Sequence, residues 1–337
     1  MKAGRLHKGW LVAVGLLALI PLSGIGLYPL HLINLILLWS FIYTSWSIMG
    51  RFGLVSFGHG AFMGIGAYTS VMLWNHFAIS PWLGIPVGIV LAVLVALLIG
   101  YPCFRFRITG HYFALVTLAL TEVVRLVIVA LRDVTGGSLG VTPNTVLQDQ
   151  SFSIAALQFQ SKAVFFYILL ACWLFGLWVW KLVDRSMARY AMEAIGQDED
   201  ASASVGINVT RTKLTITVIS AALTALGGAL YAQYQQYVNP ETVSGIGISL
   251  QIVFAVIAGG MFVQLGPTVG AAFTLLLAES LRIFIGNNLH ALDSTIYGLM
   301  LILFIIFMPS GILGKILARR RPSGARVAPP RARPAPG

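Results

Sequence analysis

The chain has 337 residues, of which 58% are hydrophobic and 10% are charged, and its mean hydropathy is +0.86. Soluble domains carry about 25% charged residues, so this composition excludes an ordinary soluble enzyme and indicates a protein that crosses a membrane several times. The formal net charge of +11 does not indicate a nucleic-acid partner, because all but four of the 22 lysines and arginines fall on one side of a ten-span arrangement. The four exceptions are Arg125, Arg132, Lys162 and Arg282.

Apolar stretches follow one another along the chain, most of them long enough to cross a membrane as helices. We expect spans at approximately 10–28, 30–49, 54–74, 82–101, 111–131, 163–182, 214–236, 248–260, 267–285 and 294–308. An even number of spans places both termini on one side, and the basic residues near both ends indicate that this side is the cytoplasm. The sequence therefore predicts an all-α polytopic integral membrane protein of about ten transmembrane helices, with cytoplasmic N and C termini.

The predicted organisation is a cytoplasmic segment at 1–9, a transmembrane domain at 10–314 and a tail at 315–337. The tail is rich in arginine, proline and alanine, so we expect it to be disordered, and its positive charge would suit an anionic lipid surface. Two connections exceed turn length. The outer one, 132–162, could form a lid or a docking surface, and the other, 184–213, lies on the cytoplasmic side.

Two stretches within spans are rich in glycine and also carry polar groups or proline, at 54–68 and 259–272. Breaks of this kind free backbone groups, which are tolerated at membrane depth only where protein or a water-lined cavity satisfies them. Both stretches are therefore candidates for a substrate path. Close helix packing through GxxxG is the alternative, and the two are compatible. The candidate path residues, two of them from the span at 111–131, are Ser56, Gly58, His59, Gly60, Tyr112, Thr117, Gly259, Gly260 and Gly266.

Two spans carry an acid and a base three positions apart, Glu122 with Arg125 and Glu279 with Arg282. The repetition hints at an internal repeat. Such pairs could mark a polar interior, because a charge at membrane depth must face protein or water. They could also neutralise themselves near a span end, as neighbours three apart on a helix can, and the sequence favours this second interpretation.

The cytoplasmic connection contains a short predicted helix. Asp198 can cap its start, Glu199 and Asp200 place acids in its first turn, and Gly206 can end it. A helix over 199–205 would present a small, smooth face, which suits a groove on another protein. The alternative is a solvated connector that lies on the lipid headgroups.

The sequence predicts no catalytic centre, no metal site and no cofactor. The six histidines are scattered without an HExxH motif, the two cysteines lie far apart, and no GxSxG occurs. His59 and Ser56 could offer hydrogen bonds to a zwitterionic substrate, although a lone histidine in a span is more often a packed residue. No P-loop signature occurs, and the nearest string, at 311–315, has the wrong spacing. Any energy for transport must therefore come from a partner or from an ion gradient.

The cytoplasmic connection also carries a family resemblance. The segment RSMARYAMEAIGQDEDASASVGINVTRTKL at 185–214, followed by ISAALTALGGALYA, resembles the central region of the branched-chain amino acid permeases of ABC importers, specifically the longer of their two paired membrane subunits. The spacing of Asp200, Ala201 and Ser202 to Gly206 resembles the EAA loop of such permeases. Segments that agree with the same family lie at 50–70, 110–125, 135–141, 259–271 and 297–314. The chain departs from the family at Met187, Ala188, Gly196 and Gln197, so we assign no individual salt bridge to the ATPase partner there. It also departs at Phe262, where the family often has glycine, which leaves open how closely the backbone approaches at that position.

The resemblance implies a bacterial inner-membrane permease subunit that imports branched-chain, hydrophobic amino acids. Its implied partners are a second homologous permease, two cytoplasmic ATP-binding subunits and a periplasmic substrate-binding protein, within membrane lipid. The implied coupling contacts to the ATPase are Arg189, Ala191, Glu193, Ala194, Ile195, Asp200, Ala201, Ala203 and Gly206.

Three alternatives stay open. Related permeases carry urea or short amides, so the substrate is not fixed by the resemblance. An ion-coupled secondary transporter could use Glu122 or Glu279 for protons, but it would leave the long cytoplasmic connection without a role. A membrane transferase would need paired acids at the cytoplasmic face, and the three consecutive acids at 198–200 point in different directions on a helix, which suits a helix start better than a metal.

Overall fold

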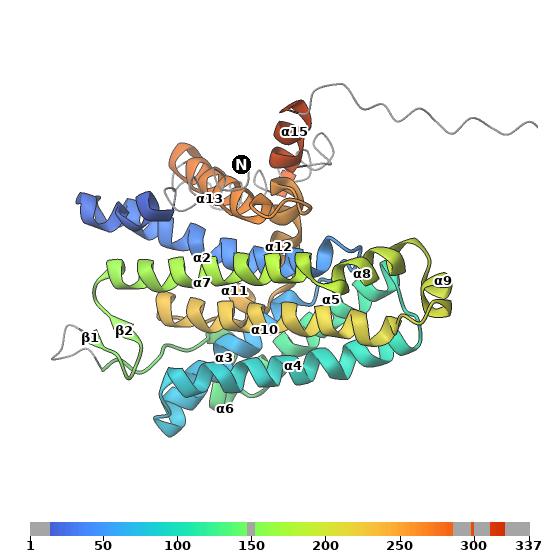
Figure 1. Ribbon diagram of the computed structural model, residues 1–337. Coiled ribbons are helices and arrows are strands. Elements are labelled where there is room, and N and C mark those ends of the chain that lie inside the picture. Colours follow the sequence, from blue (N-terminus) through green and yellow to red (C-terminus); the bar gives the residue numbers. More distant parts are fainter. Residues whose placement is uncertain (1–13, 147–151, 286–297, 300–310, 321–337) are drawn as a thin grey trace, which may run out of the picture.

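The computed structural model of the protein describes residues 14–146, 152–285, 298–299 and 311–320 (Figure 1). Within these residues the chain is almost wholly helical, with one small hairpin. The cytoplasmic segment expected at 1–9 lies outside the described residues, as do most of the last expected span and the tail from 321 onward.

Six helical segments of the described residues are long and apolar enough to cross a membrane. They are α2 (Leu27–Gly50), α4 (Pro81–Arg105), α5 (Gly110–Ala130), α7 (Lys162–Arg185), α10 (Val209–Gln235) and the segment Pro240–Gly259, which comprises α11 (Pro240–Ser244) and α12 (Ile246–Gly259). The chain is therefore a multi-pass membrane protein. A total of about ten spans and the cytoplasmic placement of both termini stay predictions.

The remaining elements are shorter or less apolar. The helices are η1 (Ile20–Ser23), α3 (His59–Phe77), α6 (Arg132–Thr135), η2 (Gly137–Leu139), α8 (Met187–Gln197), α9 (Glu199–Ser204), α13 (Gly266–Ile285) and α15 (Gly311–Arg320). The hairpin is formed by β1 (Phe152–Ser153) and β2 (Gln158–Phe159), paired antiparallel with Phe152 opposite Phe159.

The long helices run along a common direction, so the molecule has two distinct ends (Figure 1). Helix α10 packs on α2, α3 and α4, and α2 also packs on α7 and α13. Helices α8 and α9 lie at one end, which we call the α9 end, and the β1–β2 hairpin lies at the other, the hairpin end.

Helix α2 forms the centre of the bundle, whereas α4 and α5 lie at its outside. In the most apolar stretch of α2, 78% of the residues are buried, against 33% for α4 and 28% for α5. The outer face of α4 presents large apolar side chains such as Leu94 and Leu98, which are 54% and 70% exposed. Exposed apolar surface of this kind is expected where a helix faces lipid or another membrane subunit.

Glycines let α3 approach α10 closely. A Cβ added at Gly66 would lie 2.0 Å from the Ala225 carbonyl oxygen, and one at Gly228 would lie 2.0 Å from the Met63 carbonyl oxygen. Backbone contact across a helix pair is a recurrent way to gain packing energy in membranes, where no hydrophobic effect drives helices together.

Candidate functional site

The short helix expected in the cytoplasmic connection is present as α9. Asp198 caps it, and its Oδ1 accepts hydrogen bonds from the backbone N–H groups of Asp200 and Ala201, at 2.9 and 3.0 Å. At the other end, the N–H of Gly206 donates to the Ala203 carbonyl at 3.0 Å and the N–H of residue 207 donates to the carbonyl of residue 202 at 3.1 Å. This is a Schellman end, and it needs a residue with positive φ, which Gly206 supplies at +92°.

One side of α9 is held on the bundle and the other is free. Glu199 forms an ion pair with Lys213 of α10, whose side chain is only 3% exposed. Ala201 and Ala203 are exposed, and Val205, directly after the helix, is 76% exposed. The pair between Asp200 and Arg107 is exposed on both sides, so it contributes little to holding the helix. The result is a short, anchored helix with a small outward face.

A second helix, α8, precedes α9 and was not expected from the sequence. It buries Met192 and Ile195 in the core beside α7 and α10, while Glu193 is exposed. Ile195 therefore faces inward, whereas the other residues that the resemblance implies on α8, Arg189, Ala191, Glu193 and Ala194, are partly or fully exposed.

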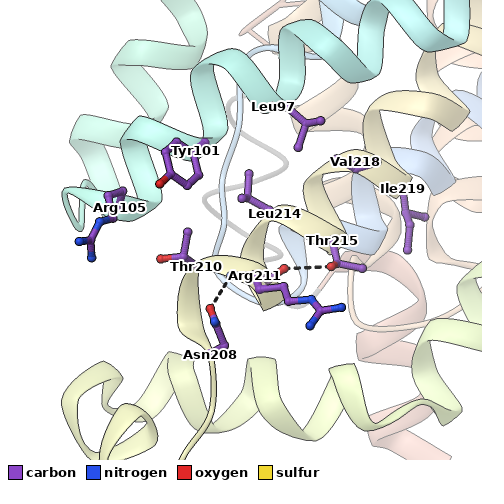
Figure 2. Close-up of a pocket in the computed structure, with 10 residues that line it drawn as sticks. All are labelled: Leu97, Tyr101, Arg105, Asn208, Thr210, Arg211, Leu214, Thr215, Val218 and Ile219. Atoms are coloured by element: carbon purple, nitrogen blue, oxygen red, sulfur yellow. Dashed lines mark hydrogen bonds between the residues drawn. The ribbon is translucent and has the colours of Figure 1, made fainter.

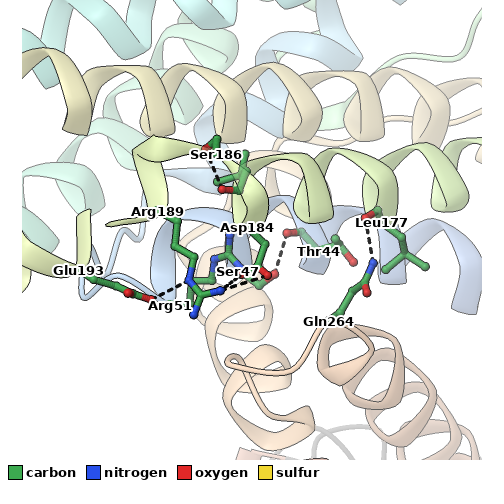
Figure 3. Close-up of polar contacts among 10 residues, drawn as sticks. Thr44, Ser47, Arg51, Leu177, Asp184, Ser186, Arg189, Glu193 and Gln264 are labelled. Carbon is green, nitrogen blue, oxygen red and sulfur yellow. Dashed lines mark hydrogen bonds and ion pairs between the residues drawn. The ribbon is translucent and has the colours of Figure 1, made fainter. Parts of the chain in front are cut away.

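A buried arginine lies beneath α8. Arg51, directly after α2, has a side chain that is only 6% exposed, and its Nη1 lies 3.0 Å from Oδ1 of Asp184 on α7 (Figure 3). The guanidinium carbon lies 4.0 Å from the ring centroid of Trp180 and 4.7 Å from that of Phe52. Burial lowers the pKa of Arg51 to about 10, and the charge of Asp184 opposes this, so the group stays protonated at neutral pH.

The same aspartate also holds α8. Arg189 of α8 lies 3.3 Å from the Asp184 carboxylate and donates through Nε to Glu193 at 2.8 Å (Figure 3). Asp184 thus joins the end of α2, the end of α7 and the start of α8. The sequence analysis missed this cluster, and the available signal was a charged residue, Arg51, inside a glycine-rich connection between two spans.

Residues 51–58, which connect α2 to α3, form an irregular segment that we call the polar break. Side chains from two other helices satisfy its backbone: Trp46 of α2 donates to the Ser56 carbonyl at 2.7 Å, and the Phe57 N–H donates to Thr117 Oγ1 of α5 at 3.0 Å. Thr121 of α5 donates to the Phe57 carbonyl at 2.7 Å. Ser56 Oγ itself accepts from the Gly58 N–H at 3.0 Å.

The first turn of α3 continues this hydroxyl network. The Gly60 N–H donates to Ser249 Oγ of α12 at 3.1 Å. His59 is fully buried, with Nε2 at 2.7 Å from Ser220 Oγ of α10 and no hydrogen-bond partner for Nδ1 among the described residues. His59 also contacts the rings of Trp46 and Phe62 edge to face. His59 is therefore a packed residue in this structure, which is the second of the two interpretations given for it in the sequence analysis.

The polar break contains little free space. The cavity beside it, lined by Ser56, Thr117, Thr217 and apolar neighbours, has a volume of about 10 Å³, enough for about one water molecule at most. An amino acid does not fit, so this region of the chain is closed. Tyr112 is 75% exposed and takes no part in the network.

The second glycine-rich stretch, 259–266 between α12 and α13, is built differently, and we call it the glycine junction. A Cβ at Gly259 would lie 2.0 Å from the Gly266 carbonyl oxygen, and one at Gly266 would lie 1.8 Å from the Gly260 carbonyl oxygen. Gly260 has φ of +112°. Here the packing alternative is confirmed, because glycine is required for direct backbone contact.

The two acid and base pairs differ in the structure. Arg125 pairs with Glu122, as the favoured interpretation expected, and also with Glu241 of α11 at 2.7 Å. Glu279 instead bonds the Tyr28 hydroxyl, and Arg282 has no ion pair among the described residues. The idea that each pair neutralises itself is therefore wrong for the second pair, because α13 lies against α2 and offers Glu279 a closer partner.

Comparison with known proteins identifies relatives over most of the chain. Residues 28–305 match the family model of the branched-chain amino acid transport system / permease component. The high-affinity branched-chain amino acid transport system permease protein LivM of Escherichia coli (strain K12) is 30% identical over 284 residues, which cover 79% of this chain and 65% of the relative. The corresponding LivH protein of Salmonella typhimurium is 26% identical over 288 residues, 80% of this chain and 88% of the relative.

The chain spans slightly less than two thirds of the length of its LivM relatives. A probable LivH permease of Methanocaldococcus jannaschii is 24% identical over 268 residues. No solved structure shows significant similarity to this chain. These relatives are transport permeases and not enzymes, and the match covers most of the helical bundle. The chain belongs to the family of branched-chain amino acid transport permease components.

Proposed function

We propose that the chain is the membrane-spanning subunit of an ATP-driven importer for branched-chain or related hydrophobic amino acids in a bacterial inner membrane. The family match over 28–305 supports the transport role, and the names of the LivM and LivH relatives support the substrate class. The structural observation that carries the proposal is α9, a capped helix on a buried lysine with a free outer face.

The chain resembles both LivM and LivH relatives, which supports a pairing with a second homologous permease. It has no P-loop signature, so we place ATP hydrolysis on two separate cytoplasmic subunits and substrate delivery on a periplasmic binding protein. Purification from the native membrane in mild detergent tests this directly. Two ATPases and a second permease should come with the chain, and a chain that is purified alone from intact membranes would contradict the proposal.

In the mechanism we propose, the ATPases move α9 when they close on ATP. The Glu199–Lys213 pair would carry that motion to α10, and the Asp184 cluster would carry the motion of α8 to the end of α2. Arg51 is the first residue of the polar break, so this route ends where the backbone is held by exchangeable hydroxyl bonds. The net free energy of exchanging such a hydrogen bond for one to water is small, so this segment can open without leaving its backbone groups unsatisfied.

The route through α8 makes Arg189 a testable positioning residue. In the Arg189→Gln variant the buried Arg51–Asp184 pair stays intact, and the lost pairs are partly exposed, so the melting temperature should change little. Uptake of leucine per ATP hydrolysed should fall several-fold in vesicles that contain the whole assembly. The control is Arg185→Gln, which removes a charge at the same end from an exposed residue with no ion pair among the described residues. If leucine uptake per ATP hydrolysed is the same in Arg189→Gln and Arg185→Gln, the proposed transmission of motion through α8 is contradicted.

The substrate class and the energy source can each be tested independently of the rest of the proposal. Competition of leucine uptake by isoleucine and valine supports the amino acid assignment, whereas competition by urea or acetamide alone would favour the amide alternative. Uptake that follows a proton gradient without ATP would favour a secondary transporter.

A further inference from the structure

A groove of about 680 Å³ lies between α4 and α10 at the α9 end, outside the polar break and outside α9 itself (Figure 2). The α4 wall carries Leu97, Tyr101 and Arg105. The α10 wall and the residue before it carry Asn208, Thr210, Arg211, Leu214, Thr215, Val218 and Ile219. The groove opens on the outer side of the bundle, because Leu97 and Tyr101 belong to the exposed face of α4.

The polar end of the groove holds two arginines without counter-ions. Neither Arg105 nor Arg211 forms an ion pair with any residue that the structure describes, although other basic residues at this end, Arg51, Arg107 and Lys213, do. Both arginines are exposed. Both line the groove beside the start of α10, where the helix dipole adds positive potential and Asn208 Oδ1 accepts the hydrogen bond of the Arg211 N–H. This end of the groove therefore attracts an anion.

The rest of the groove is mostly apolar, since the hydroxyl of Thr215 bonds the Arg211 carbonyl, and it continues along α10 away from the α9 end. Leu97 of α4 and Leu214 and Val218 of α10 form its walls over more than one helical turn from Arg211. Tyr101 stands between the two parts, where Figure 2 shows its ring on the α4 wall, and tyrosine is enriched at this level of a membrane. A soluble anion would leave these apolar walls unused, so the groove fits a molecule with an anionic head and an apolar chain.

We propose that this groove binds an anionic phospholipid. Its phosphate lies near the hydroxyl of Thr210, between Arg105 and Arg211, whose exposed side chains point apart in Figure 2 and turn toward the phosphate when it binds; an acyl chain lies along Leu97 and Leu214. Guanidinium groups match phosphate geometry, and basic pockets between transmembrane helices recognise anionic headgroups. This assignment depends on the chain spanning a membrane and not on the transport proposal, so either can fail without the other.

The test is a lipid titration of the purified full chain in neutral detergent, read by native mass spectrometry and by the melting temperature. Phosphatidylglycerol should bind and raise the melting temperature, whereas phosphatidylcholine should not. The Arg105→Gln/Arg211→Gln double variant should bind phosphatidylglycerol about thirtyfold more weakly, since each basic residue near an anionic headgroup contributes about 1 kcal/mol and 1.4 kcal/mol is tenfold in affinity.

Two controls keep the result specific. Arg185→Gln removes a positive charge from the same end of the molecule outside the groove and should keep wild-type affinity. Leu97→Ser changes the apolar wall and leaves both arginines in place. It should weaken the binding of phosphatidylglycerol. Inorganic phosphate alone should give no stabilisation. The proposal is overturned if phosphate stabilises as well as the lipid does, if the double variant binds like the wild type, or if Arg185→Gln loses as much affinity as the double variant.

Discussion

The polar break and the glycine junction look alike in sequence and are opposites in structure. Both are glycine-rich interruptions of apolar spans. In the polar break, the backbone groups are satisfied by hydroxyls from neighbouring helices, as where Phe57 bonds Thr117 and Thr121. In the glycine junction, Gly259 and Gly266 place one backbone directly on another. Glycine content alone therefore does not distinguish a segment that can rearrange from one that is locked.

The difference lies in what each segment loses when it moves. A hydroxyl partner can be exchanged for water or for a polar substrate, and the net free energy of such an exchange is small. In the glycine junction two backbones touch so closely that an added Cβ would lie within 2.0 Å of a carbonyl oxygen. Water cannot take the place of such a packing contact. We accordingly assign movement during transport to the polar break and keep the glycine junction rigid.

The largest expected effect is at the glycine junction. In Gly266→Ala the new methyl group meets the Gly260 carbonyl oxygen at 1.8 Å, so the two backbones must separate. We expect a loss of about 3 kcal/mol in stability, seen as a strongly lowered melting temperature in detergent. The matched control is Gly247→Ala in α12, where nothing lies within 4 Å of the added Cβ. If both variants melt together with the wild type, the glycine junction is not locked by contact.

A smaller effect is expected at the edge of the polar break. Ser249→Ala removes the acceptor of the buried Gly60 N–H, and an unsatisfied buried donor costs about 1–3 kcal/mol. The melting temperature should therefore fall less than in Gly266→Ala. Ser280→Ala is the control, because within the described residues its hydroxyl bonds only a carbonyl of its own helix, and it should shift stability by less than about 0.5 kcal/mol. Equal shifts for the two serines would show that the hydroxyl network contributes nothing.

The smallest effect on stability is expected at Gly206. The same position should have the largest effect on the coupling of ATP hydrolysis to uptake. In Gly206→Val nothing lies within 4 Å of the added Cβ, so the cost comes from the φ of +92°, about 1–2 kcal/mol for a side chain in the left-handed region. ATP hydrolysis by the assembly should persist while uptake per ATP falls. The control is Gly196→Val, at a glycine of α8 with free space and no positive φ. An unchanged uptake ratio in Gly206→Val would remove the end of α9 from the coupling route.

Sequence reasoning located α9 because its determinants are local. Asp198 and Gly206 act on backbone groups within a few positions of themselves, so cap and stop can be identified without the fold. The Asp184 cluster could not be found in this way, because Arg51 and Asp184 are 133 positions apart and meet only when α2 packs on α7. The same holds for Glu279, whose partner Tyr28 lies on another helix.

The candidate path stays a prediction, and the structure brings only some of its residues together. The residues at 56–60 do form one buried polar site, and Thr117 joins it from α5. Tyr112 and the glycines at 259, 260 and 266 do not join it, because side-chain direction and helix packing decide which polar or small residue faces which neighbour. The amphipathic helix α8 was missed because it buries only Met192 and Ile195, and charged Glu193 lies between them.

The most direct test of the account is leucine uptake by vesicles that contain this chain and its second permease, measured with and without the ATP-binding subunits at saturating binding protein. We predict that uptake requires both ATP and the separate ATPases, and that the uptake per ATP falls in Gly206→Val. Leucine accumulation at the full rate without the ATPases would contradict the central claim that α9 couples this permease to an external motor.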